Sequence, residues 1–135
     1  SGAYAVAAGS SAPTTTLTGA TALAAGWLEG VTTVLDGAHV LLSIADEPVP
    51  ERFAGPPGTG VAAAFLLGPA DAPLPRAELD RRIELAIVEG PVDVPPLSTT
   101  LAAACRAIAN GAGAVAIGPI APGATLELRV REERA

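Results

Sequence analysis

The sequence contains no lysine and no methionine, a single cysteine, a single histidine, and only one tryptophan, one tyrosine and two phenylalanines. Its eight basic residues are all arginine, and 14 carboxylates bring the net charge to -6. Because no basic stripe is present to neutralise phosphates, nucleic-acid binding is not expected. Cys105 has no second cysteine with which to form a disulfide, so a reducing compartment is favoured and the cytoplasm is the expected location.

Long hydrophobic runs are also missing. The longest, Val61 to Leu67, is far shorter than the ~20 residues of a membrane-spanning helix, so no membrane association is expected. Half of the residues are hydrophobic, mostly alanine, valine and leucine, which indicates a core built largely from small side chains. The 15 glycines and 13 prolines are scattered without a period. The length of 135 residues predicts one folded domain over residues 1–135.

The spacing of apolar residues and of turn-forming residues predicts the elements of this domain. A three-and-four spacing predicts a helix over 20–35, which Asp36 and Gly37 end. A second helix is predicted over 99–109, with Ser98 as its cap and Leu101, Cys105 and Ile108 buried. This order predicts an α/β fold with a mixed, partly antiparallel sheet of about five strands and helices packed on it. Short apolar or β-branched runs predict strands at 14–18, 39–44, 61–67, about 82–89, 114–117 and 126–131. The strands at 39–44 and 61–67 are expected to be covered on both faces.

The segment from Gly55 to Ala62 has the spacing of a phosphate-binding P-loop. Val61 and Ala62, however, stand where the P-loop needs a lysine for the phosphates and a serine or threonine for magnesium. The loop also precedes a predicted strand, whereas a P-loop leads from a strand into a helix. Nucleotide binding is therefore not expected, and the sequence predicts no cofactor.

His39, Cys105, Asp46 and Glu47 are the other candidate site residues. No second histidine and no cysteine pair could complete a zinc site with His39, so no metal is expected and His39 is interpreted as a strand-entry or surface residue. Cys105 is interpreted as a small buried hydrophobe. Asp46 and Glu47 follow a buried strand, but adjacent residues there point in different directions, so we interpret them as loop anchors. The mixed-charge segment 129–134 is expected to be a solvated edge.

Four segments carry a family resemblance: APTTTLTGATA at 12–22, GWLEG at 26–30, VLL at 40–42 and DEPVP at 46–50. With them the chain resembles the β-ketoacyl synthase-like N-terminal domain family, short synthase-like proteins of aryl polyene and related polyketide or fatty-acid gene clusters. The resemblance runs from the first residue to about Gly68 and more loosely to the C-terminus. It implies a thiolase-like half-domain. It also implies an N-terminally shortened member, whose earlier strands are missing, cleaved or supplied by another chain.

The resemblance places Thr21 at the position of the nucleophilic cysteine, on an elbow formed by Gly19 to Thr21. A threonine hydroxyl is scarcely ionised at neutral pH, and the sequence supplies no base to activate it. The implied function is a catalytically silent protein that pairs with an active ketoacyl synthase or with a copy of itself through residues 14–18, with an acyl carrier protein as a further partner. Two alternatives stay open: a weak acyltransferase or hydrolase that uses Thr21, and a scaffold module without a pocket.

Overall fold

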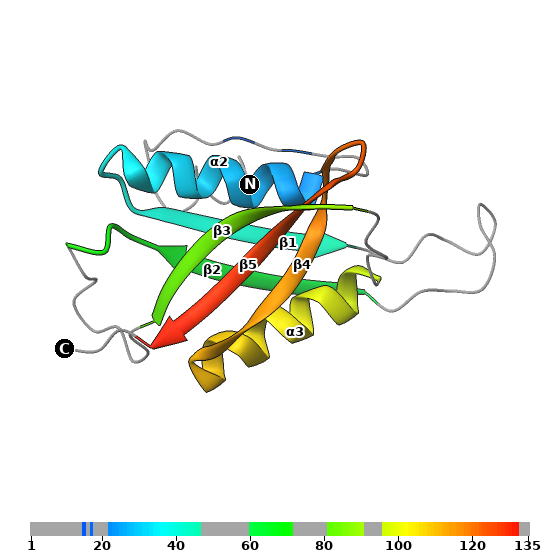
Figure 1. The fold of residues 1–135 in the computed structure, drawn as a ribbon. Helices are drawn as coiled ribbons and strands as arrows, with labels where there is room; N and C mark the ends of the chain where they lie inside the picture. The colour runs from blue at the N-terminus through cyan, green and yellow to red at the C-terminus, as the bar shows by residue number, and fades with distance from the viewer. Residues whose placement is uncertain are drawn as a thin grey trace.

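The structure, a computed structural model, describes residues 15, 17, 22–46, 60–71, 81–90 and 96–132. The strands form two antiparallel sheets, β1–β2 and β3–β5–β4 (Figure 1). In the view of Figure 1 the two-stranded sheet lies behind the three-stranded sheet, with one helix along each side. The elements in chain order are α2 (Ala22–Leu35), β1 (Val40–Asp46), β2 (Val61–Leu67), β3 (Arg81–Glu89), α3 (Leu97–Asn110), β4 (Ala112–Ala121) and β5 (Ala124–Glu132).

The α/β class is confirmed, but the prediction of one mixed sheet is wrong, because the five strands of the described part divide between two sheets. The connections explain the pairing. A parallel neighbour requires a long crossover, usually a helix, whereas a short connection returns the chain antiparallel. β4 and β5 are joined through Pro122 and Gly123, and the φ of Gly123 is +74°. β1 and β2 pair along their whole length, from Val40 opposite Leu67 to Asp46 opposite Val61.

Helix α2 confirms the predicted helix over 22–35 and its predicted end, while Ala20 and Thr21 lie outside the described residues. Gly37 has a φ of +98°, and its amide donates to the carbonyl of Val34 at 2.9 Å. Two glycines on this helix face the two-stranded sheet. A Cβ atom placed on Gly26 would lie 3.6 Å from Leu42 Cδ1, and one on Gly30 would lie 3.5 Å from Leu67 Cδ1. The backbone of α2 therefore lies close against β1 and β2.

Strands β1 and β2 correct the expectation that both of their faces are covered. Residues on the core side are half-buried or buried, whereas the residues between them are exposed. Leu41 and Leu66, which pair across the two strands, are 58% and 59% exposed. The described helices pack on one side of this hairpin and leave its other side uncovered by any described helix. We call that side the Leu41–Leu66 face; its members are Leu41, Ser43, Ala45, Ala62, Ala64 and Leu66.

Helix α3 corrects two predictions. Pro96 occupies the N-cap position, with no side-chain cap in place of the one expected from Ser98, and Thr100 Oγ1 donates to the Pro96 carbonyl at 3.3 Å. Cys105 is exposed rather than buried. Ala104, the residue before Cys105, lies on the buried face of the helix instead, because its small side chain allows close packing against β4. The buried residues of α3 are Thr100, Leu101, Ala104 and Ala107.

The remaining strands lie where they are predicted, but they are longer. β3 confirms the strand expected from about Arg82. β4 continues through Gly118 and Pro119, which were predicted to lie at or beyond its end, because register shifts beside these residues accommodate the proline. β5 extends to Glu132.

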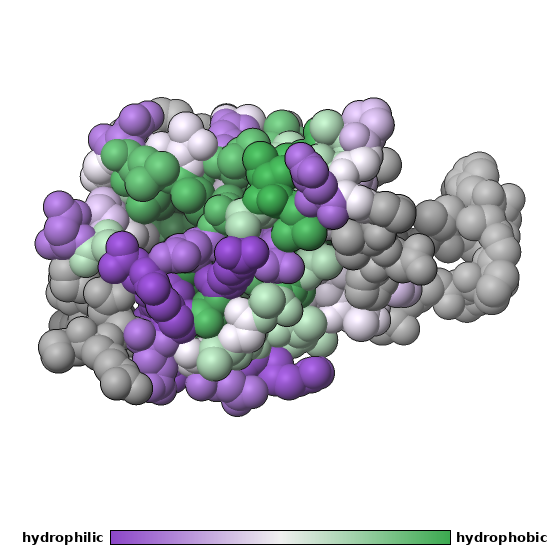
Figure 2. Space-filling model, viewed as in Figure 1, coloured by the Kyte–Doolittle hydropathy of each residue, from purple (hydrophilic) through white to green (hydrophobic). Residues whose placement is uncertain are grey.

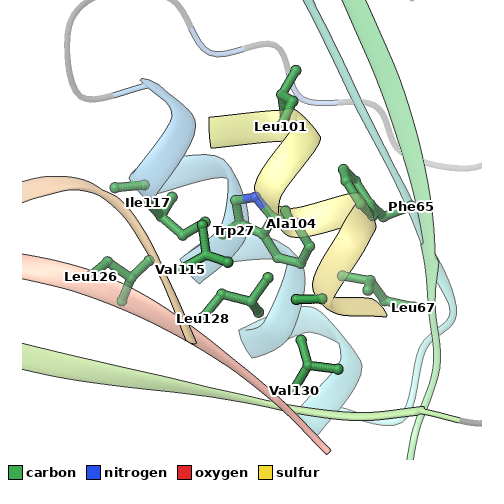
Figure 3. Close-up of a cluster of buried hydrophobic side chains, with 12 residues drawn as sticks. Trp27, Phe65, Leu67, Leu101, Ala104, Val115, Ile117, Leu126, Leu128 and Val130 are labelled. Carbon is green, nitrogen blue, oxygen red and sulfur yellow. The ribbon is translucent and has the colours of Figure 1, made fainter. Parts of the chain in front are cut away.

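The hydrophobic core lies between the two sheets and the two helices (Figure 3). Its centre is Trp27, which is 0% exposed and lies 4.9 Å from Phe65 between ring centroids. The expectation of a core made of small side chains therefore needs correction, because a tryptophan and a phenylalanine fill the space between the layers and alanines line the helices. The core residues are Ala24, Trp27, Phe65, Leu67, Leu101, Ala104, Ala107, Val115, Ile117, Leu126, Leu128 and Val130.

The outer face of the three-stranded sheet is charged. Arg131 Nη2 lies 2.6 Å from Glu84 Oε1 on β3, and Arg129 Nε lies 2.7 Å from Glu127 Oε1. Figure 2 shows hydrophilic residues gathered over β3 and β5 and hydrophobic ones along α2. Residues 129, 131 and 132 are exposed, as expected of a solvated segment, but the prediction of an edge is wrong, because β5 lies between β3 and β4. The two sheets thus present outer faces of opposite chemistry, one charged and one uncharged.

Candidate functional site

Thr21, the candidate nucleophile, and its elbow lie outside the described residues; α2 begins at Ala22, the next residue. Glu47 and residues 55–59 of the P-loop-like segment also lie outside the described part. Of the candidate contact segment 14–18, Thr15 and Leu17 are described and belong to no strand. The predicted role of this region stays a prediction.

The other candidate residues do not come together. His39 is exposed and precedes β1, whereas Asp46 is exposed at the other end of the same strand, about 23 Å away at the rise of a β-strand. Cys105 is exposed on α3. In the described ranges no group of three His, Cys, Asp or Glu side chains is placed to hold a metal ion. No helix among the described residues is long and apolar enough to cross a membrane.

An open depression lies at the C-terminal end of α3, lined by Asn110, Gly111, Ala112, Arg131 and Glu132. Arg81 makes the polar contacts beside this depression. Its Nε donates to the carbonyl of Ile108 at 2.8 Å and its Nη2 to that of Ala109 at 3.3 Å. These carbonyls end the helix and carry its partial negative charge, so a guanidinium stabilises them. Arg81 therefore fastens β3 to α3, and we assign this cluster a structural role.

The structure exposes apolar side chains at several places that sequence reasoning missed. Besides the Leu41–Leu66 face, α2 exposes Leu28 at 45% and Leu35 at 81%, and β3 exposes Ile87 at 64%. Figure 2 shows hydrophobic residues along α2 and the adjoining part of β3. The only sequence signal was the unbroken apolar character of 61–67 and of 40–42, which we interpreted as burial on both faces. Exposed apolar groups on both sheets are suited to association with other protein surfaces.

Comparison with known proteins found no matching family model, no matching curated protein and no matching solved structure.

Proposed function

We propose that this chain is a catalytically silent, β-ketoacyl synthase-like protein of a polyketide, aryl polyene or fatty-acid-type pathway, and that it pairs with an active ketoacyl synthase. The family in this proposal comes from the resemblance at 12–22, 26–30, 40–42 and 46–50. The thiolase-like half-domain is part of the same proposal.

The observation that supports pairing is the Leu41–Leu66 face. Its six members are leucine, alanine or serine, and none carries a charge. Removal of such apolar surface from water is favourable by about 25 cal/mol for each Å². Leu41 and Leu66 lie side by side across the two strands, and the residues beside them on this face are small. The small residues allow the close approach of a partner's helix or sheet around the two leucines.

Capture of a neighbouring synthase tests the proposal. Tagged protein is expected to co-purify with a ketoacyl synthase encoded beside its gene. Leu41→Glu places a carboxylate in the contact, and since an unpaired charge is costly to bury, the captured amount is expected to fall about tenfold or more.

Ile87→Glu is the matched control, because Ile87 is similarly exposed but lies on the other sheet; capture should be unchanged. Failure of the unsubstituted protein to capture the synthase refutes the proposed pairing. Equal capture by the Leu41→Glu variant assigns the contact to another surface.

The absence of acyl transfer is a separate prediction. After incubation with acyl thioesters, intact-mass measurement is expected to show no adduct, because the Thr21 hydroxyl stays protonated. An adduct that disappears in Thr21→Ala would contradict catalytic silence and establish the alternative acyltransferase or hydrolase. An adduct that survives Thr21→Ala and disappears in Cys105→Ser is instead chemical acylation of the exposed thiol.

A further inference from the structure

Strand β3 is an outer strand of its sheet. It pairs with β5 over all nine residues without a register shift, and its other edge has no partner strand within the described part of the chain. β3 contains no proline and no bulge, two of the features that keep such edges from pairing, although four of its nine residues carry the charges that are a third. The edge is therefore a long, regular template for another strand.

The apolar residues of β3 point to the core side but are not fully covered. Cross-strand partners share a face of a sheet, and Ile83, Leu85 and Ile87 lie opposite three buried residues of β5. Ile87 is nevertheless 64% exposed, although its partner Leu126 is only 1% exposed. The apolar row thus extends beyond the covered core to the open edge, where a further strand would continue it.

The sequence of β3, RRIELAIVE, is complementary to itself when one copy is reversed about Leu85. An antiparallel pair with a two-fold axis at Leu85 places Ile83 opposite Ile87 of the second copy and Leu85 opposite Leu85. Arg81 then lies opposite Glu89 of the second copy, while its guanidinium stays on the carbonyls of Ile108 and Ala109. Apolar pairs that face each other across two strands stabilise the pairing.

The two adjacent registers are worse. An axis at Glu84 places the two Glu84 carboxylates directly opposite each other, and like charges in that position are destabilising. An axis at Ala86 places Ile83 opposite Glu89, so an apolar side chain meets a charged one. With the axis at Leu85, Glu84 faces Ala86 and keeps its 2.6 Å ion pair with Arg131. The axis at Leu85 also places Arg82 opposite Val88 on the other face, so each register contains a pair of an apolar and a charged residue. Only this axis, however, sets each of Ile83, Leu85 and Ile87 opposite an apolar residue, and this match on the core side selects the register.

We propose that β3 pairs antiparallel with β3 of a second copy of this chain, about a two-fold axis at Leu85, and joins the two three-stranded sheets into one continuous sheet. The charged outer faces then lie on the same side, and the apolar rows of the two copies meet on the other. The inference does not depend on the proposed function, because the Leu41–Leu66 face belongs to the other sheet.

Distances between spin labels test the register. In a Cys105→Ser background, single cysteines are introduced at Arg82, Glu84, Ala86 and Val88, which alternate along β3 with Ile83, Leu85 and Ile87, and are labelled for electron paramagnetic resonance. Label backbones at 84 and 86 are expected to lie about 7 Å apart along the strands, and those at 82 and 88 about 20 Å, since each residue adds ~3.3 Å from each copy. If one of these four positions alone gives the shortest distance between the two labels, the axis at Leu85 is wrong.

Sedimentation equilibrium tests the dimer itself. The unsubstituted protein is expected to be a dimer, and Ile87→Glu to weaken the association constant about tenfold or more while circular dichroism shows an unchanged fold. Leu41→Glu is the matched control and should remain dimeric. A monomer at every concentration overturns the proposal, and so does a dimer that Ile87→Glu leaves as strong as before. Neither outcome bears on capture of a synthase, so the two proposals fail separately.

Discussion

Replacement of Trp27 by alanine is expected to lower the free energy of unfolding by about 3–5 kcal/mol, the range for loss of a fully buried aromatic residue. Trp27 is 0% exposed and packs against Phe65 at the centre of the layers (Figure 3). Its removal leaves a cavity in contact with α3 and both sheets. Since a domain of this kind is stable by only about 5–15 kcal/mol, much of the native stability is lost.

Trp27→Phe is the control that separates packing from hydrogen bonding. Trp27 Nε1 is buried and has no acceptor among the described residues, so phenylalanine removes no hydrogen bond while keeping a ring in the space. The expected cost is about 1–2 kcal/mol, that of a smaller side chain in the core. Urea unfolding followed by circular dichroism measures both variants, because Trp27 is the only tryptophan and its fluorescence is lost. A Phe variant as unstable as the Ala variant would show that the indole N–H is bonded.

Gly111→Ala is expected to lower the free energy of unfolding by about 2–4 kcal/mol. Gly111 ends α3 with a φ of +74°, a conformation that costs an L-residue about 1–2 kcal/mol. A Cβ atom there would lie 2.5 Å from Glu132 Cγ and 3.0 Å from Arg81 Nε. Glu132 can swing into solvent, but Arg81 is held by the carbonyls of Ile108 and Ala109. The added methyl group therefore disturbs the contact that joins β3 to α3.

Gly123→Ala provides a matched control for backbone strain. Gly123 has the same φ of +74°, but nothing lies within 4 Å of a Cβ atom placed there. Its substitution is expected to cost only the strain, about 1–2 kcal/mol. The difference between the two variants in urea unfolding measures the steric effect on the Arg81 cluster. Equal costs would mean that Arg81 and Glu132 move aside freely, and would contradict the structural role of Arg81.

The predictions that succeeded rest on local signals. The helix over 22–35 follows from apolar residues spaced by three and four, and its end follows from Gly37, whose positive φ lets the last carbonyls find donors. The strand over 61–67 is bounded by glycines on both sides. The choice of strand over helix at 81–89 rests on the β-branched residues Ile87 and Val88 before Gly90. Each of these signals depends on residues within one or two turns of the chain.

The predictions that failed depend on residues far away in the sequence. The spacing of Leu101, Cys105 and Ile108 is as compatible with one buried helix face as is the set of α3 residues that the structure buries. Contact with β4 decides that Ala104 is buried and Cys105 exposed. The apolar run at 61–67 is compatible with cover on both faces, but the described helices cover only one. The cluster at the end of α3 also joins Arg81 to carbonyls 27 and 28 residues away.

The single cysteine, read from the sequence alone, determined that no internal disulfide forms. The spacing of apolar residues, together with the glycine and proline positions, determined the helices, most strand locations and the α/β class. Only the tertiary structure decided that the described strands divide between two sheets, that Trp27 lies between them, and that no described element covers the Leu41–Leu66 face or pairs with the outer edge of β3. The physical reason is that helix ends and strand lengths are set by neighbouring residues, whereas burial is set by whichever distant segment packs against a face.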